Sequence, residues 1–128
     1  MDPAFLNLEE VLQIHTDQIE RYGGRAGIRD LTLLESAVAA PQAGFSNQYL
    51  HSDLFEMAGA YLFHIVQNHP FVDGNKRVGA AAALVFLKLN GIDLRISNPA
   101  LVRIVLNVAR GKTGKAAVAE FFRKNTRK

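Results

Sequence analysis

The residues best suited to chemistry lie together in residues 68–77, which read Asn-His-Pro-Phe-Val-Asp-Gly-Asn-Lys-Arg. This stretch holds an imidazole, a carboxylate and two cations. His69 is a natural general base, because an unperturbed imidazole has a pKa of about 6.5 and can accept the proton of a hydroxyl at neutral pH. Beside a phosphate group, Asp73 would hold Mg²⁺ together with phosphate oxygens; its alternative role is to cap the next helix.

Lys76 and Arg77 stand where a helix disfavours cations. Pro70 should end the preceding helix, so that residues 74–77 form the first turn of the next one. The free N–H groups and the positive dipole end of such a turn attract anions, and each cation there costs about 0.3–1 kcal/mol. A bound polyanion would offset this cost, with Lys76 as a point charge and Arg77 as a bidentate fork.

The other residues of the stretch have supporting roles. Phe71 is expected to anchor the loop in the core. Gly74 permits a positive φ or the close approach of a ligand. Asn75 is either the N-cap of the next helix or a direct phosphate ligand, and the two roles do not exclude each other.

The pattern His-Pro-Phe-x-Asp-Gly-Asn-Lys-Arg resembles the signature of the Fic/Doc superfamily. Lys76 stands where nucleotidylating Fic proteins usually have Gly, which makes the chain similar to the death-on-curing (Doc) branch. The resemblance extends over nearly the whole chain. Its flanking matches lie at residues 22–24, 27–30, 34–37 and 89–91.

The resemblance implies an all-α, Fic-like bundle and the toxin of a type II toxin–antitoxin system, encoded by a bacterium or a phage. It implies a Ser/Thr kinase-like enzyme that uses ATP and Mg²⁺ to phosphorylate a hydroxyl of elongation factor Tu with the γ-phosphate, arresting translation and growth. His69, Asp73, Lys76 and Arg77 would be catalytic. The alternatives are Fic-type transfer of AMP, which a long cation at position 76 disfavours, and a non-catalytic module that binds an acidic partner.

Fic proteins often carry an inhibitory Ser/Thr-x-x-x-Glu-Gly/Asn helix. Thr16 to Glu20 and Ser52 to Glu56 have this spacing, but Arg21 and Met57 follow them. We therefore expect no internal inhibitor. The Doc resemblance instead implies a separate, Phd-like antitoxin, whose disordered C-terminal segment folds as a helix in an apolar groove of the toxin.

Composition indicates one soluble domain over residues 1–128, with 48% hydrophobic residues and no cysteine. The absence of cysteine fits a reducing cytoplasm, and no signal peptide or membrane span is recognisable. The net charge is +3, yet six cations and a single anion lie beyond Arg110. A solvated helix end explains this basic tail better than nucleic-acid binding does.

Helical periodicity predicts six helices around an apolar central one, with no sheet. His15 lies near an apolar helix face and is interpreted as a core or boundary histidine. Residues 42–52 should be a loop whose rings, Phe45, Tyr49 and His51, seal the core or, by the resemblance, border the mouth of the site. The expected helices are residues 8–22 after Asn7, a short one after Asp30, residues 54–68 after Asp53, residues 74–90 buried on all sides from Val78, one from Asn98-Pro99 to Gly111, and residues 115–124.

Two further patterns do not indicate sites. Gly111-Lys112-Thr113 resembles the end of a phosphate-binding loop, but Leu106 replaces its first glycine and a helix precedes it. His64 and His69 are five residues apart, whereas a helical metal pair needs a spacing of about four.

Overall fold

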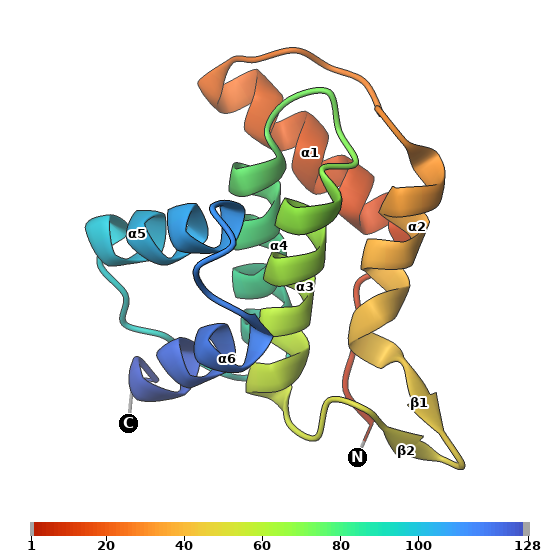
Figure 1. Cartoon of the computed structure of the whole chain (residues 1–128), viewed down its shortest axis with the longest axis vertical. Coiled ribbons are helices and arrows are strands. Elements are labelled where there is room, and N and C mark those ends of the chain that lie inside the picture. The colour runs from red at the N-terminus through yellow and green to blue at the C-terminus, as the bar shows by residue number, and fades with distance from the viewer. Residues whose placement is uncertain (1, 127–128) are drawn as a thin grey trace.

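The predicted helical segments form six α-helices in the structure, a computed structural model that describes residues 2–126 (Figure 1). Within this range, no helix is long and apolar enough to cross a membrane. The all-α expectation is confirmed, with one small hairpin added. The elements are α1 (Leu8–Tyr22), α2 (Leu31–Ala39), the 3₁₀ helix η1 (Ala40–Gln42), β1 (Gly44–Phe45), β2 (Gln48–Tyr49), α3 (Leu54–Asn68), α4 (Asn75–Leu89), α5 (Asn98–Ala109) and α6 (Lys115–Lys124).

Side-chain caps explain where several helices begin. Asn7, Asp30 and Asp53 accept hydrogen bonds from backbone N–H groups of α1, α2 and α3, as predicted. The prediction for α5 was wrong by one residue: the N-cap is Ser97, whose Oγ accepts a hydrogen bond from the N–H of Ala100. Serine is as good a cap as asparagine, and local pattern alone does not separate adjacent candidates.

Helices α3 and α4 lie side by side at the centre of the molecule (Figure 1). They approach closely at Gly79, where a Cβ would lie 2.8 Å from Cγ2 of Val66 and 3.2 Å from the carbonyl oxygen of Leu62. The expectation that α4 is buried on all sides was wrong, because Val85 and Leu89 are 42% and 53% exposed. Its neighbours α1, α3 and α5 cover only part of its circumference.

The segment before α3 differs from the predicted loop, because β1 and β2 pair as an antiparallel hairpin. Ser46 and Asn47 at its tip both have positive φ, the geometry of a tight hairpin turn, for which Ser-Asn is a weak sequence signal. His51 is buried, but Phe45 is 86% exposed and does not seal the core. The hairpin lies at the opposite end of α3 from the loop between α3 and α4 (Figure 1).

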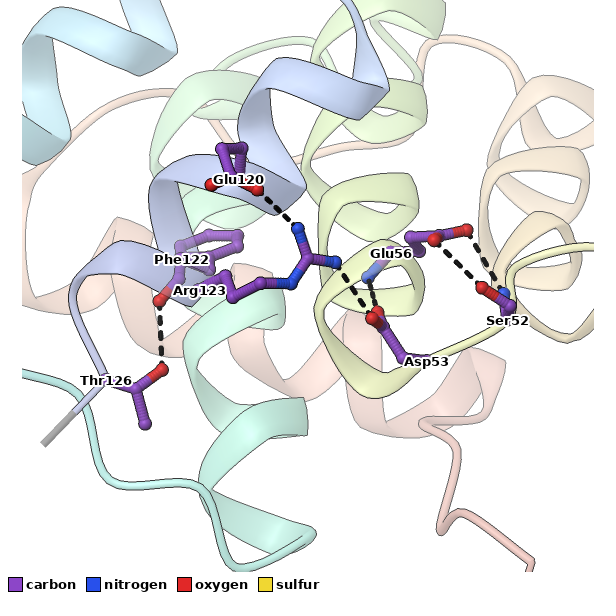
Figure 2. Close-up of polar contacts among 7 residues, drawn as sticks. All are labelled: Ser52, Asp53, Glu56, Glu120, Phe122, Arg123 and Thr126. Carbon is purple, nitrogen blue, oxygen red and sulfur yellow. Dashed lines mark hydrogen bonds and ion pairs between the residues drawn. The ribbon is translucent and has the colours of Figure 1, made fainter. Parts of the chain in front are cut away.

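Polar contacts attach α6 to the start of α3 (Figure 2). Arg123 donates to Oδ2 of Asp53 at 2.8 Å and also pairs with Glu120. Asp53 therefore caps α3 with one oxygen and binds α6 with the other. Ser52 contacts Glu56 through both its backbone N–H and its hydroxyl. Part of the basic C-terminal region thus serves helix packing.

A second polar cluster joins α6 to α3 and to the segment after the hairpin. Nζ of Lys115 lies 3.3 Å from Nε2 of His51 and 3.2 Å from Nε2 of His64. Because an ammonium can only donate, both imidazoles accept through Nε2 and are neutral. Burial, and then the charge of Lys115, lowers the pKa of His51 and lowers that of His64 to about 4.

This cluster predicts a loss of stability in mild acid. In the unfolded chain His64 takes up a proton near its ordinary pKa of 6.5, whereas in the folded chain it does so only near 4. Between these values the unfolded state binds more protons, so the free energy of unfolding falls as the pH falls. We expect His64 to account for about 1 kcal/mol between pH 7 and 4.5 after solvent screening is allowed for.

Denaturant unfolding of the wild type and of His64→Gln across this pH range tests the prediction. In His64→Gln the free energy of unfolding should fall less steeply as the pH is lowered. Identical pH dependence in the two proteins would contradict it.

Candidate active site

The loop between α3 and α4 carries the predicted functional residues and has an unusual entry. His69 is the C-cap of α3, with φ 50° and ψ 52°, a left-handed conformation that is uncommon for a residue other than glycine. Pro70 disfavours right-handed helical geometry at His69, so α3 ends at Asn68 as predicted. The residue adopts the left-handed region rather than an extended one, which turns the chain sharply toward α4.

Arg29, about forty residues earlier in the sequence, caps the C-terminal end of α3 with its side chain. Its Nε donates to the carbonyl oxygen of His69 at 2.6 Å and its Nη2 to that of Asn68 at 2.9 Å. These carbonyls have no partner within the helix, and a cation beside them also suits the negative end of the helix dipole. The sequence did not predict this role for Arg29. The residue was noted only as part of the flanking match at residues 27–30.

The backbone of residues 27–30 runs along the loop as a clamp. The N–H groups of Arg29 and Asp30 both donate to the carbonyl of Pro70, at 2.7 and 3.0 Å, and the N–H of Val72 donates to the carbonyl of Gly27 at 3.0 Å. The segment before α2 therefore supplies partners for the backbone groups of Pro70 and Val72.

Phe71 anchors the loop in the core, as predicted, and is fully buried. Its ring stacks on that of His15, with centroids 3.9 Å apart. The Nε2 of His15 lies 2.9 Å from the carbonyl oxygen of Asp73, which can only accept, so His15 donates to it. His15 is a core histidine as expected, and it also fixes the loop at Asp73.

Asn75 is not the N-cap of α4; that position is Gly74, which has a φ of 84°. Only 4% of Asn75 is exposed. Its Oδ1 accepts from the N–H of Phe71 at 2.9 Å, while Nδ2 lies 3.0 Å from the carbonyl of Phe71 and 3.1 Å from Nδ1 of His69. The side chain is thus committed to the loop, and a phosphate contact at this position falls to its backbone N–H.

Asp73 has an oriented and ionised carboxylate. Its Oδ2 accepts from the N–H of Arg25 at 3.1 Å and its Oδ1 from the N–H of Gly74 at 2.9 Å. These two backbone donors, first that of Arg25, hold the pKa of Asp73 below its usual range, and Arg77 adds to the effect. The glycine-rich segment after α1, which the sequence indicated only as a turn, therefore orients the carboxylate of a predicted site residue.

The carboxylate of Asp73 could bind Mg²⁺ only together with oxygen ligands from other groups. Within residues 2–126, no group of three or more His, Cys, Asp or Glu side chains could hold a metal ion. A single ionised carboxylate, completed by phosphate oxygens and water, is a usual arrangement for Mg²⁺ at phosphoryl-transfer sites. Asp73 fits that arrangement.

The two cations at the start of α4 have different surroundings. Nη2 of Arg77 donates to the carbonyl of Gly23 at 3.0 Å and Nη1 to that of Gln18 at 3.4 Å, so Arg77 also neutralises the negative end of α1. These contacts with α1 explain the presence of a cation at position 77 even without a bound anion. Lys76 is exposed and forms no hydrogen bond or ion pair within residues 2–126.

A cavity of about 550 Å³ brings the predicted site residues together. The N-terminus of α4 opens into it. The first intrahelical bond runs from the N–H of Val78 to the carbonyl of Gly74, so the N–H groups of residues 75–77 have no partner within the helix and are available to an anion. No residue of the 42–52 segment borders it. The lining residues are Val66, Gln67, His69, Asp73, Gly74, Asn75, Lys76, Arg77 and Ala109.

Comparisons with known proteins find a family and two relatives that the chain resembles. A family model described as "Fic/DOC family" matches residues 5–87. The "Protein kinase doc" of Escherichia phage P1 is 33% identical over 116 residues, which cover 91% of this chain and 90% of that protein. The "Toxin Doc" of Mycolicibacterium smegmatis (strain ATCC 700084 / mc(2)155) is 41% identical over 90 residues, 70% of this chain and 67% of that protein.

Gly24 offers a test of how the site is held. A Cβ at Gly24 would lie 2.8 Å from Oδ2 of Asp73 and 3.0 Å from Nη2 of Arg77, whereas a Cβ at Gly23 would contact nothing within 4 Å. Both glycines have positive φ, so Gly23→Ala is a matched control for backbone strain. Gly24→Ala should displace both side chains and cost about 1 kcal/mol more than the control.

Thermal unfolding and hydrogen exchange of the Arg25 amide measure the effect. Exchange should accelerate in Gly24→Ala and stay near the wild-type rate in Gly23→Ala. Equal behaviour of the two variants would show that Gly24 is not needed for the carboxylate's position.

Proposed function

The chain belongs to the Fic/DOC family, and we propose that it is the toxin of a type II toxin–antitoxin system that phosphorylates a hydroxyl of elongation factor Tu with the γ-phosphate of ATP. One observation carries the proposal: His69, an ionised Asp73 and the exposed Lys76 border a single cavity at the free N-terminus of α4. An imidazole, a carboxylate and an anion-binding helix end are the parts that phosphoryl transfer to a hydroxyl needs.

In this mechanism His69 accepts the proton of the target hydroxyl while the hydroxyl oxygen forms a bond to the γ-phosphorus. The bond from that phosphorus to the bridging oxygen breaks, and ADP leaves with the electron pair. Asp73 would hold Mg²⁺, which neutralises charge on the phosphates. The N–H groups of the first turn of α4, beginning with that of Asn75, bind phosphate oxygens, and Gly74 allows the phosphate to approach closely because it has no side chain.

Lys76 and Arg77 supply charge to the transferring group in different ways. Lys76 has a free ammonium that can approach a phosphate oxygen directly. Arg77 keeps two of its five N–H donors on the carbonyls at the end of α1, and the others remain for a phosphate. A long cation at position 76, where nucleotidylating relatives usually have Gly, favours transfer of the γ-phosphate over transfer of AMP.

The names of the two relatives support the proposed class of activity, since one is called a kinase and the other a toxin. We further propose a cytoplasmic site of action and a co-encoded, Phd-like antitoxin. Its C-terminal segment would fold as a helix on this chain, which agrees with regulation by a partner rather than by an internal inhibitory helix.

Incubation of the purified chain with Mg²⁺, a bacterial lysate and either γ-labelled or α-labelled ATP tests the transfer chemistry. We expect a protein the size of elongation factor Tu to retain only the γ-label, because only the terminal phosphoryl group is transferred. Retention of the α-label would instead establish AMP transfer. A mass gain of one phosphate on the target confirms the group transferred, and fragmentation of the modified peptide locates the residue.

Replacement of His69 tests the role of the base. His69→Ala should lower the transfer rate by about 10²–10⁴-fold, the usual contribution of a positioned base, with little change in folding because the side chain is exposed. His64→Gln, which alters a histidine outside the cavity, should retain the rate. Growth arrest that persists in folded His69→Ala and Asp73→Ala variants would instead favour the non-catalytic binding module.

A further inference from the structure

The amide of Asn75 has only one orientation compatible with its backbone partners. Oδ1 faces the N–H of Phe71 at 2.9 Å and Nδ2 faces the carbonyl of the same residue at 3.0 Å. The reversed amide would place two donors against each other and two acceptors against each other. The buried position of Asn75, in the first turn of α4, keeps the side chain in this arrangement.

The second hydrogen of Nδ2 is then directed at His69. Nδ2 lies 3.1 Å from Nδ1 of the imidazole, and an amide nitrogen can only donate. Nδ1 must therefore offer a lone pair. Since a neutral imidazole carries a single N–H, that hydrogen is on Nε2.

Hydrogen bonds fix the backbone of His69 as well as its ring. Its N–H donates to the carbonyl of Ile65 at 3.2 Å, and its carbonyl accepts from Arg29 at 2.6 Å. The ring can leave Asn75 only by a change of its own rotamer or by a rearrangement of the clamped loop.

We propose that Asn75 is a positioning residue that holds His69 as the Nε2–H tautomer, and that this contact keeps the base inactive at rest. The inference rests on the proposed function for its consequence. A base needs a free lone pair, yet the lone pair of Nδ1 is taken by Asn75 and Nε2 already bears a proton. Resting His69 can donate a hydrogen bond to a substrate oxygen but cannot accept the hydroxyl proton. The contact with Asn75 must break before transfer.

The other histidines of the chain provide internal references for an NMR test. The sequence has four histidines. His15 donates through Nε2 to a carbonyl and must be the Nε2–H tautomer. His51 and His64 accept through Nε2 from Lys115 and must be the Nδ1–H tautomer. One spectrum therefore contains both patterns.

The experiment is a long-range ¹H–¹⁵N correlation of the ¹⁵N-labelled full chain at pH about 8, where unperturbed imidazoles are neutral. His69, assigned with His69→Gln, should show the pattern of His15. In Asn75→Asp the new carboxylate accepts from Nδ1–H, so His69 should change to the pattern of His51 and His64. In Asn75→Ala no side chain at position 75 contacts Nδ1 of His69, so the signals of His69 should average between the two patterns.

An Nδ1–H pattern for His69 in the wild type would overturn the inference. So would an unchanged His69 pattern in both variants while the other three histidines keep theirs, which shows that the fold is intact. The readout needs no substrate. If His69 shows the expected patterns but no target is phosphorylated, the proposed function fails and the tautomer assignment stands.

Discussion

The site depends on how the chain passes from α3 to α4. Two helices that lie side by side must be joined within residues 69–74, and the turn at His69 leaves the last carbonyls of α3 without helical partners. Arg29 supplies two of the missing donors, and the amide of Asn75 ties the turn to the first residues of α4. His69 enters the cavity in a fixed direction because its own backbone is held at both ends.

The same loop explains why functional and structural roles overlap here. Asp73 is oriented by the amide of Arg25, and its carbonyl accepts from His15, whose ring in turn stacks on Phe71. These contacts stabilise the loop and fix Asp73, which borders the cavity. A small helical domain can thus provide backbone donors for the proposed phosphoryl-transfer site without a phosphate-binding loop between a strand and a helix, because a helix N-terminus and a clamped loop supply them.

The helices and their caps could be predicted from sequence because their signals are local. Asn7 and Glu10, or Asp53 and Glu56, are three residues apart, and the motif itself is contiguous. The contacts that support the site could not be predicted, because they join residues far apart along the chain. The separation is 40 residues for Arg29 and His69, 48 for Arg25 and Asp73, and 58 for His15 and Asp73. Nothing in the spacing of those residues marks such partners. The hairpin was missed for a different reason, since two strands of two residues carry almost no periodicity.

The two cations at the start of α4 show where a dipole argument from one helix is incomplete. Taken alone, α4 disfavours both Lys76 and Arg77, and a polyanion is then the obvious compensation. In the fold, however, the guanidinium of Arg77 reaches the C-terminal end of α1, where a cation is favourable, and it donates hydrogen bonds to the carbonyl oxygens of Gln18 and Gly23. Only Lys76 remains without such compensation. Lys76 and the free N–H groups of α4 therefore favour an anion in the cavity, whereas Arg77 joins α1 to the site.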